Sequence, residues 1–193
     1  MDKVKANRFM NVMQCVLVGI GALNSLLTLY NSIARKMALA FVVTALVEVL
    51  AFAGIIQYAS FGCRKEGRFF FAVIFATAAV VVFQQHQIQS DTNILMTIAF
   101  GCLMVFAATL KDKTNARCAI MGAVFMLIAA GIMYTVQISK MPVPPEMVGN
   151  LPAPKKDFLD LVSRYSSFWT SPLLAASVGF AYEVKCNREK TTR

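Results

Sequence analysis

Charged side chains are scarce in this sequence. They make up 15% of its 193 residues, whereas hydrophobic residues make up 58%. A soluble domain carries about 25% charged residues and about 45–50% apolar ones. Between Phe69 and Leu110 the only formal charge is that of Asp91. This scarcity argues against an ordinary soluble domain, and the long uncharged apolar runs indicate segments that span a membrane.

Histidine is almost absent as well. His86 is the only one, and the five cysteines form no CxxC pair. A single histidine excludes a bis-histidine haem and a multi-histidine metal site within one chain, so we expect neither a metal ion nor another cofactor. An enzyme would need a cluster of nucleophile, base or metal ligands. We see no such cluster in the sequence and expect a protein that is not an enzyme.

Six apolar segments predict a single all-α transmembrane domain over residues 1–193, a polytopic bundle of six membrane helices. The predicted spans cover residues 9–30, 37–59, 69–88, 93–110, 118–138 and 167–184. Most have the roughly 17–25 residues that a helix needs to cross a hydrocarbon core of about 30 Å. The fourth and sixth are short, and Pro172 interrupts the sixth. That helix is therefore either kinked or begins earlier, near Asp157.

The basic residues predict how the bundle is oriented. The net charge is +9, and most of the nineteen Lys and Arg residues lie before the first span, in the second and fourth connections, and after the last span. In a six-span bundle these places share one side, so the positive-inside rule puts both termini in the cytoplasm. The first span is expected to be a retained helix rather than a signal peptide. We expect a plasma or inner membrane, with an organelle membrane as the alternative.

One carboxylate lies in the middle of the second span. Glu48 is surrounded by the apolar stretch "FVVTALVEVLAFAG". A charged side chain at that depth costs about 2.5–3.5 kcal/mol, and such residues face the interior of a bundle. Thr44 precedes Glu48 by one helical turn and is small enough to let another helix approach. The sequence therefore predicts a polar site inside the membrane at Glu48.

The first span supplies polar groups that could accompany this carboxylate. They recur at helical intervals and form one small-and-polar stripe: Gln14, Gly21, Asn24, Ser25, Thr28, Asn31 and Ser32. If the first two spans form a hairpin, Asn24 comes within reach of Glu48, with Ser25 and Thr28 beside it. Two interpretations remain open. The contact is either a structural hydrogen bond between helices, worth about 0.6 kcal/mol, or part of a proton or cation site.

A second polar cluster lies at the outer end of the third span, in "FQQHQIQSDTN". Gln84, Gln85, His86 and Asp91 are its main members. A histidine beside an aspartate can sense pH or bind a ligand. A solvated turn at the headgroups is the favoured interpretation, because polar helix ends are ordinary there.

The connection over residues 139–166 holds five of the six prolines. Proline at this density favours extended backbone rather than a packed core. The segment is interpreted either as a lid or partner-docking loop or as a passive connector, since long loops without a role are uncommon in compact domains.

Two classes of function fit these features. The polar stripe and the central acid favour a channel or transporter for an ion, a proton or a small solute. The alternative is a non-catalytic scaffold or accessory subunit that assembles with partner membrane proteins through its helices and its outer loop. Six short helices leave little room for a gated pathway, so we expect a homo-oligomer or a subunit of a larger membrane complex. Membrane lipids are expected partners, and nucleic acid is not, because the basic residues form short clusters between apolar runs.

Overall fold

The computed structural model describes residues 3–34, 36–63, 65–87, 92–140 and 168–191. These ranges contain six α-helices: α1 (Lys3–Ala34), α2 (Leu39–Phe61), α3 (Glu66–Gln87), α4 (Thr92–Ala108), α5 (Lys113–Lys140) and α7 (Thr170–Thr191). The predicted all-α class is confirmed. Asp91, the proline-rich segment from residue 141 onward and the alternative helix start near Asp157 lie outside the described residues.

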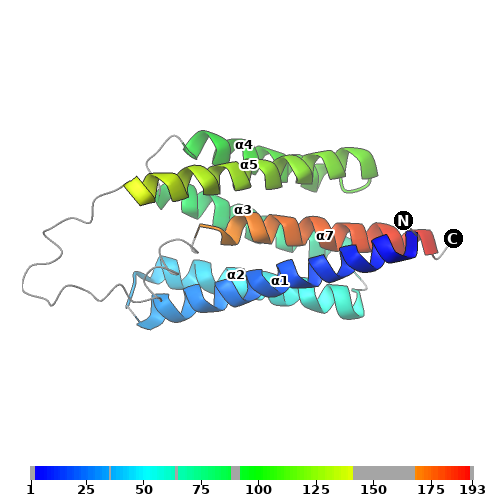
Figure 1. Ribbon diagram of the computed structural model, residues 1–193, viewed down its shortest axis with the longest axis horizontal. Coiled ribbons are helices and arrows are strands. Elements are labelled where there is room, and N and C mark those ends of the chain that lie inside the picture. The colour runs from blue at the N-terminus through cyan, green and yellow to red at the C-terminus, as the bar shows by residue number, and fades with distance from the viewer. Residues whose placement is uncertain (1–2, 35, 64, 88–91, 141–167, 192–193) are drawn as a thin grey trace, which may run out of the picture.

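The helices form one bundle around α7. Consecutive helices from α1 to α5 pack side by side, and α7 packs against α1, α2, α3 and α5. Helix α7 therefore occupies the centre (Figure 1). Helix α1 begins and α7 ends at the same end of the bundle, which we call the terminal end (Figure 1). The opposite end holds the turn between α1 and α2.

The outer surface of the bundle is strongly apolar. Large hydrophobic side chains such as Leu39, Ile94, Met121 and Phe125 are exposed. Four helical segments are long and apolar enough to cross a membrane: Gln14–Ala34, α2, α3 and α5. Helix α4 is also apolar but has only 17 residues. An apolar surface of this extent is foreign to soluble monomers and suits contact with lipid, so the structure supports association with a membrane.

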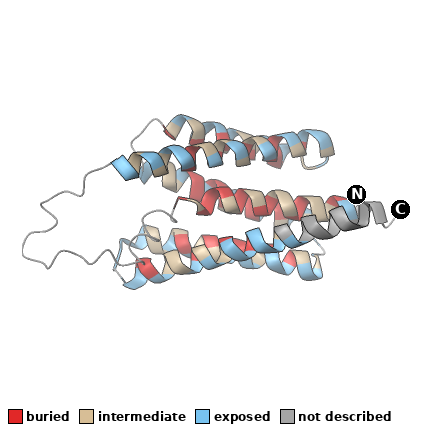
Figure 2. Ribbon diagram, viewed as in Figure 1, coloured by how far each residue is buried: buried red, intermediate tan, exposed pale blue. Residues whose placement is uncertain are grey.

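Helix α7 differs from the others because it is surrounded by protein. Its inward residues Leu174, Ala175, Val178 and Ala181 have no exposed surface, and most of the helix is buried or half-buried (Figure 2). It is not among the four segments apolar enough to span a membrane by composition. Its hydroxyl groups can be tolerated in the core because they bond within the protein; Ser177, for example, donates to the Leu173 carbonyl (2.7 Å).

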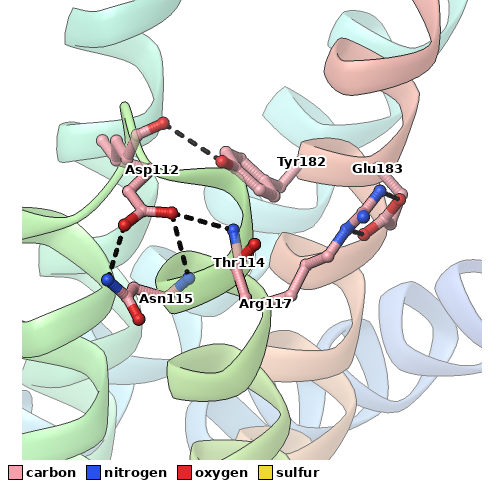
Figure 3. Close-up of polar contacts among 7 residues, drawn as sticks. Asp112, Thr114, Asn115, Arg117, Tyr182 and Glu183 are labelled. Carbon is pink, nitrogen blue, oxygen red and sulfur yellow. Dashed lines mark hydrogen bonds and ion pairs between the residues drawn. The ribbon is translucent and has the colours of Figure 1, made fainter.

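The terminal end of α7 is held by polar contacts. Arg117 of α5 forms a bidentate ion pair with Glu183 of α7, through its Nε (2.5 Å) and its Nη2 (2.8 Å). The Tyr182 hydroxyl donates to the Leu110 carbonyl after α4 (3.1 Å). Figure 3 shows both contacts. They fix α7 lengthwise against α4 and α5.

Helix α5 begins five residues before the predicted span, which starts at residue 118, because Asp112 caps it. The Asp112 Oδ1 atom accepts hydrogen bonds from the backbone N–H groups of Thr114 (3.0 Å) and Asn115 (3.3 Å) (Figure 3). An aspartate in this position satisfies N–H groups that have no partner within the helix. Residues 113–117, which lie between the predicted fourth and fifth spans, are therefore helical.

Replacing this cap tests its contribution. We expect Asp112→Ala to lower the free energy of unfolding by about 1 kcal/mol, because the first-turn N–H groups lose their acceptor. Asp112→Asn keeps a side-chain oxygen and should stay close to the wild type. Thermal unfolding of the three proteins in one detergent measures the difference. Equal stability of Asp112→Ala and the wild type would contradict the assigned cap.

Candidate functional site

Glu48 lies on the buried stripe of α2. The stripe includes Ala45, Glu48, Phe52 and Ile55, spaced at helical intervals. Only 3% of Glu48 is exposed. Its Oε2 atom accepts no hydrogen bond from any described residue. Two other buried side-chain oxygens also lack a hydrogen-bond partner among the described residues, Gln14 Oε1 and Asn93 Oδ1, but both belong to neutral amides. Leaving a buried acceptor unsatisfied costs about 1–3 kcal/mol, so Glu48 requires an explanation.

Three helices pack closely one helical turn from Glu48 toward the terminal end. A Cβ atom on Gly21 of α1 would overlap the ring of Phe52 of α2 and would lie 3.4 Å from Cβ of Leu173 of α7. Gly21 is therefore glycine because the Phe52 ring occupies the space that a side chain would need. Gly21, Phe52 and Leu173 form a layer of the core that we call the apolar layer.

The next layer toward the opposite end is polar. On α1, Asn24 lies three residues after Gly21. On α2, Glu48 lies four residues before Phe52, and on α7, Thr170 lies three residues before Leu173. Each of these steps is about one helical turn. The Asn24 Nδ2 atom donates to Thr170 Oγ1 (2.8 Å), which fixes the level of α1 against α7. We call Asn24, Glu48 and Thr170 the polar layer.

Helix α7 thus begins at the depth of the polar layer. Thr170 is its first residue, and Figure 1 shows α7 starting well inside the bundle relative to the α1–α2 turn. The Leu173 N–H donates to the Trp169 carbonyl (3.2 Å), and Pro172 has no N–H group. The positive end of the α7 dipole therefore lies beside the polar layer, where it favours an acceptor or a negative charge.

The remaining residues predicted for the intramembrane site bond to their own helices. Ser25 is fully buried and donates to the Ala22 carbonyl (2.9 Å). Thr28 donates to the Asn24 carbonyl (2.9 Å), and Thr44 donates to the Ala40 carbonyl (2.8 Å). These hydroxyl protons are engaged, so none of the three acts as a donor to Glu48. The expected partner of Glu48, Asn24, directs its amide N–H to Thr170, a residue that the sequence analysis did not select.

The predicted outer cluster does not form one site in the described residues. Gln84 faces inward and accepts a short hydrogen bond from the Ser171 hydroxyl of α7. Gln85 Nε2 donates to Thr97 Oγ1 of α4 (2.8 Å). His86 is exposed and borders an apolar groove between α3 and α4. Only Gln84 therefore belongs with the polar groups around α7.

Comparison with known proteins adds no relative. No family model, no curated protein and no solved structure matches this chain. Among the described residues, no three His, Cys, Asp or Glu side chains lie close enough to hold a metal ion. The polar layer is therefore interpreted from its own geometry.

Proposed function

We propose that this chain is a polytopic membrane protein that carries a proton, another cation or a small polar solute across the membrane through the polar layer. In this proposal all six helices cross the membrane and both termini face the cytoplasm. The observation that carries the proposal is the Glu48 carboxyl group, which is almost fully buried and leaves Oε2 without a partner among the described residues. Intramembrane acids of this kind mark ion pathways and proton relays.

The chemistry of the polar layer supports a binding role for Glu48. A purely structural carboxyl group would be expected to have hydrogen-bond partners for both oxygens, because a buried acceptor without one is destabilising. A proton taken up by the carboxylate removes its charge, and a bound cation balances that charge. The start of α7 at the same depth resembles the interrupted helices whose ends form transporter sites near the middle of the membrane.

The central position of α7 favours a carrier over an open pore. Leu174 and Val178 are fully buried on α7, so protein side chains fill the core on the terminal side of the polar layer. Transport then requires alternating exposure of the site to the two sides. We further propose that copies of the chain assemble through their apolar outer faces. The alternative function, a scaffold that displays the proline-rich segment, rests on residues outside the described part of the chain.

The first test replaces the carboxyl group by an amide of the same shape. We expect Glu48→Gln to lower flux at least tenfold, because a neutral amide neither takes up a proton nor carries a charge. Vesicles containing purified protein are given a proton, K⁺ or Na⁺ gradient, and a pH- or voltage-sensitive dye reports the flux. Unfolding and elution volume should match the wild type.

Glu66→Gln is the matched control. Glu66 is partly buried at the start of α3 and accepts a hydrogen bond from Tyr58 (3.0 Å) at the terminal end, far from the polar layer. Its flux should equal that of the wild type. Wild-type flux through Glu48→Gln for every gradient tested would reject the proposed site.

A further inference from the structure

The two sides of the polar layer differ in polarity. At the level of Glu48, Thr170 is bonded to Asn24, and the next residue of α7, Ser171, is bonded to Gln84 of α3. Thr170 and Ser171 have no exposed surface. Farther along α1, toward the opposite end, Asn31 and Ser32 are also buried. Polar groups therefore extend from the level of Glu48 toward that end.

The side chains packed next to Glu48 on the terminal side are apolar. Phe52 and Ile55 of α2 and Leu174 and Val178 of α7 have no exposed surface. The apolar layer follows Glu48 by one turn, and there the Phe52 ring fills the space that a side chain on Gly21 would need. Water and ions have no polar group to bind in such packing. In this conformation the apolar layer separates Glu48 from the terminal end.

The polar layer supplies few ligands for a metal cation. Its only carboxyl group is Glu48, and Thr170 Oγ1 already accepts the Asn24 amide. The hydroxyl of Ser25 is committed to its own helix. A bare metal ion needs a shell of several oxygen ligands, six to eight for Ca²⁺. A proton needs a single acceptor oxygen, and Glu48 Oε2 is one.

No charged group competes for Glu48 within the layer. Glu48 lies on α2, which packs on α1, α3 and α7. The described titratable side chains of these three helices lie away from the layer: Cys15 and Tyr30 on α1, Glu66, Arg68 and His86 on α3, and Tyr182, Glu183, Lys185 and Cys186 on α7. On α1 the nearest is Tyr30, six residues from Asn24, or about 9 Å at 1.5 Å per residue. On α3, His86 follows Gln84 by only two residues, but its side chain is exposed at the groove between α3 and α4. Protonation of Glu48 is thus set by access to solvent.

We infer that the species bound at Glu48 is a proton. In this conformation the proton exchanges only with the solvent at the opposite end of the bundle, along the hydroxyl and amide groups at the start of α7. Each transfer breaks one O–H bond and forms another on the next oxygen, supplied by water or a hydroxyl, so no other reactant is needed. This inference rests on the proposed function and adds the transported species and the side from which it enters.

The test measures protonation of Glu48 from each side separately. Dicyclohexylcarbodiimide reacts with protonated carboxyl groups in apolar surroundings, and the mass of the intact protein reports the reaction. The full chain is placed in phosphatidylcholine vesicles, and its orientation is measured with an impermeant maleimide on Cys63, which is exposed after α2 at the terminal end. The pH is then varied on one side while the other is held constant. Glu48→Gln identifies the modification that belongs to Glu48.

We expect the modification of Glu48 to follow the pH on the side of the opposite end and to ignore the pH on the terminal side. Thr170→Val should slow the response to a pH step about tenfold, because it removes a hydroxyl of the path. Thr77→Val is the matched control, since Thr77 is fully buried but donates to the Val73 carbonyl of its own helix (2.8 Å). Its response should equal that of the wild type.

Two results would overturn the inference, and each is distinct from failure of the proposed function. The first result is a modification of Glu48 that follows the pH on the terminal side, which would show that the inferred entry side is wrong. If flux still depends on Glu48 in that case, the proposed transport function is unaffected. The second result is a modification of Glu48 that does not change with the pH on either side. If Glu48→Gln still abolishes K⁺ or Na⁺ flux, the species bound at Glu48 is then a metal cation and not a proton. Failure of the proposed function is seen separately, as wild-type flux in Glu48→Gln.

Discussion

Phe52→Ala is expected to lower the free energy of unfolding by about 3–5 kcal/mol, the range observed when a buried phenylalanine is truncated. The Phe52 ring has no exposed surface and lies where α1, α2 and α7 meet, against Gly21. Glycine offers no side chain that could move into the cavity. Relaxation around the lost ring is therefore small, and the cost should lie toward the upper part of that range. Thermal unfolding in detergent should show a midpoint lower by about 10 °C.

Phe61→Ala provides the matched control on the same helix. Phe61 ends α2 and is 87% exposed, so its truncation removes no packed contact and should change the midpoint by less than about 2 °C. Equal losses in the two variants would show that Phe52 does not occupy the junction described above. A midpoint in Phe52→Ala that matches the wild type would have the same meaning.

Glu48→Leu is expected to act in the opposite direction and to stabilise the protein. The change replaces a buried carboxyl group, with one oxygen lacking a partner among the described residues, by an apolar side chain of similar volume. Removing such an unsatisfied acceptor should raise the free energy of unfolding by about 1–3 kcal/mol. Flux through the variant should disappear, because leucine binds neither a proton nor a cation. The single substitution would then raise stability and abolish transport.

The same substitution at Glu66 should destabilise. Glu66 accepts a hydrogen bond from Tyr58, and Glu66→Leu removes that bond. Parallel unfolding curves of the two variants measure both effects. A destabilised Glu48→Leu would mean that the carboxyl group has partners that hold the bundle together. Stabilised protein with wild-type flux would remove Glu48 from the transport pathway.

The helices of the bundle were predictable because lipid-facing helices consist of long apolar runs. Each predicted span overlaps one observed helix, from α1 to α7. Helix ends were harder, since they depend on single hydrogen bonds. Because Asp112 caps α5, this helix starts within a charged segment that was predicted to be a connection between two spans. Helix α7 starts at Thr170, within the predicted span of residues 167–184.

The site was predictable only in part, for two physical reasons. The high cost of an acid in lipid indicated that Glu48 faces inward, whatever it contacts. Its neighbours depend on packing between segments that are distant in the sequence, whereas helical spacing indicates only which residues of one span share a face. Asn24 instead meets Thr170, which is 146 residues away in the chain. Gln84, Gln85 and His86 were grouped because they are consecutive, but successive residues on a helix point about 100° apart. Each therefore reaches a different neighbour.

The position of α7 has a consequence for how the bundle is made. Among the described helices, α7 follows α1 to α5 in the chain, and it is not one of the segments long and apolar enough to cross a membrane by length and composition. It contacts four of these five described helices. In the proposed six-span arrangement, we therefore expect α7 to enter the bilayer by docking onto helices that precede it in the chain.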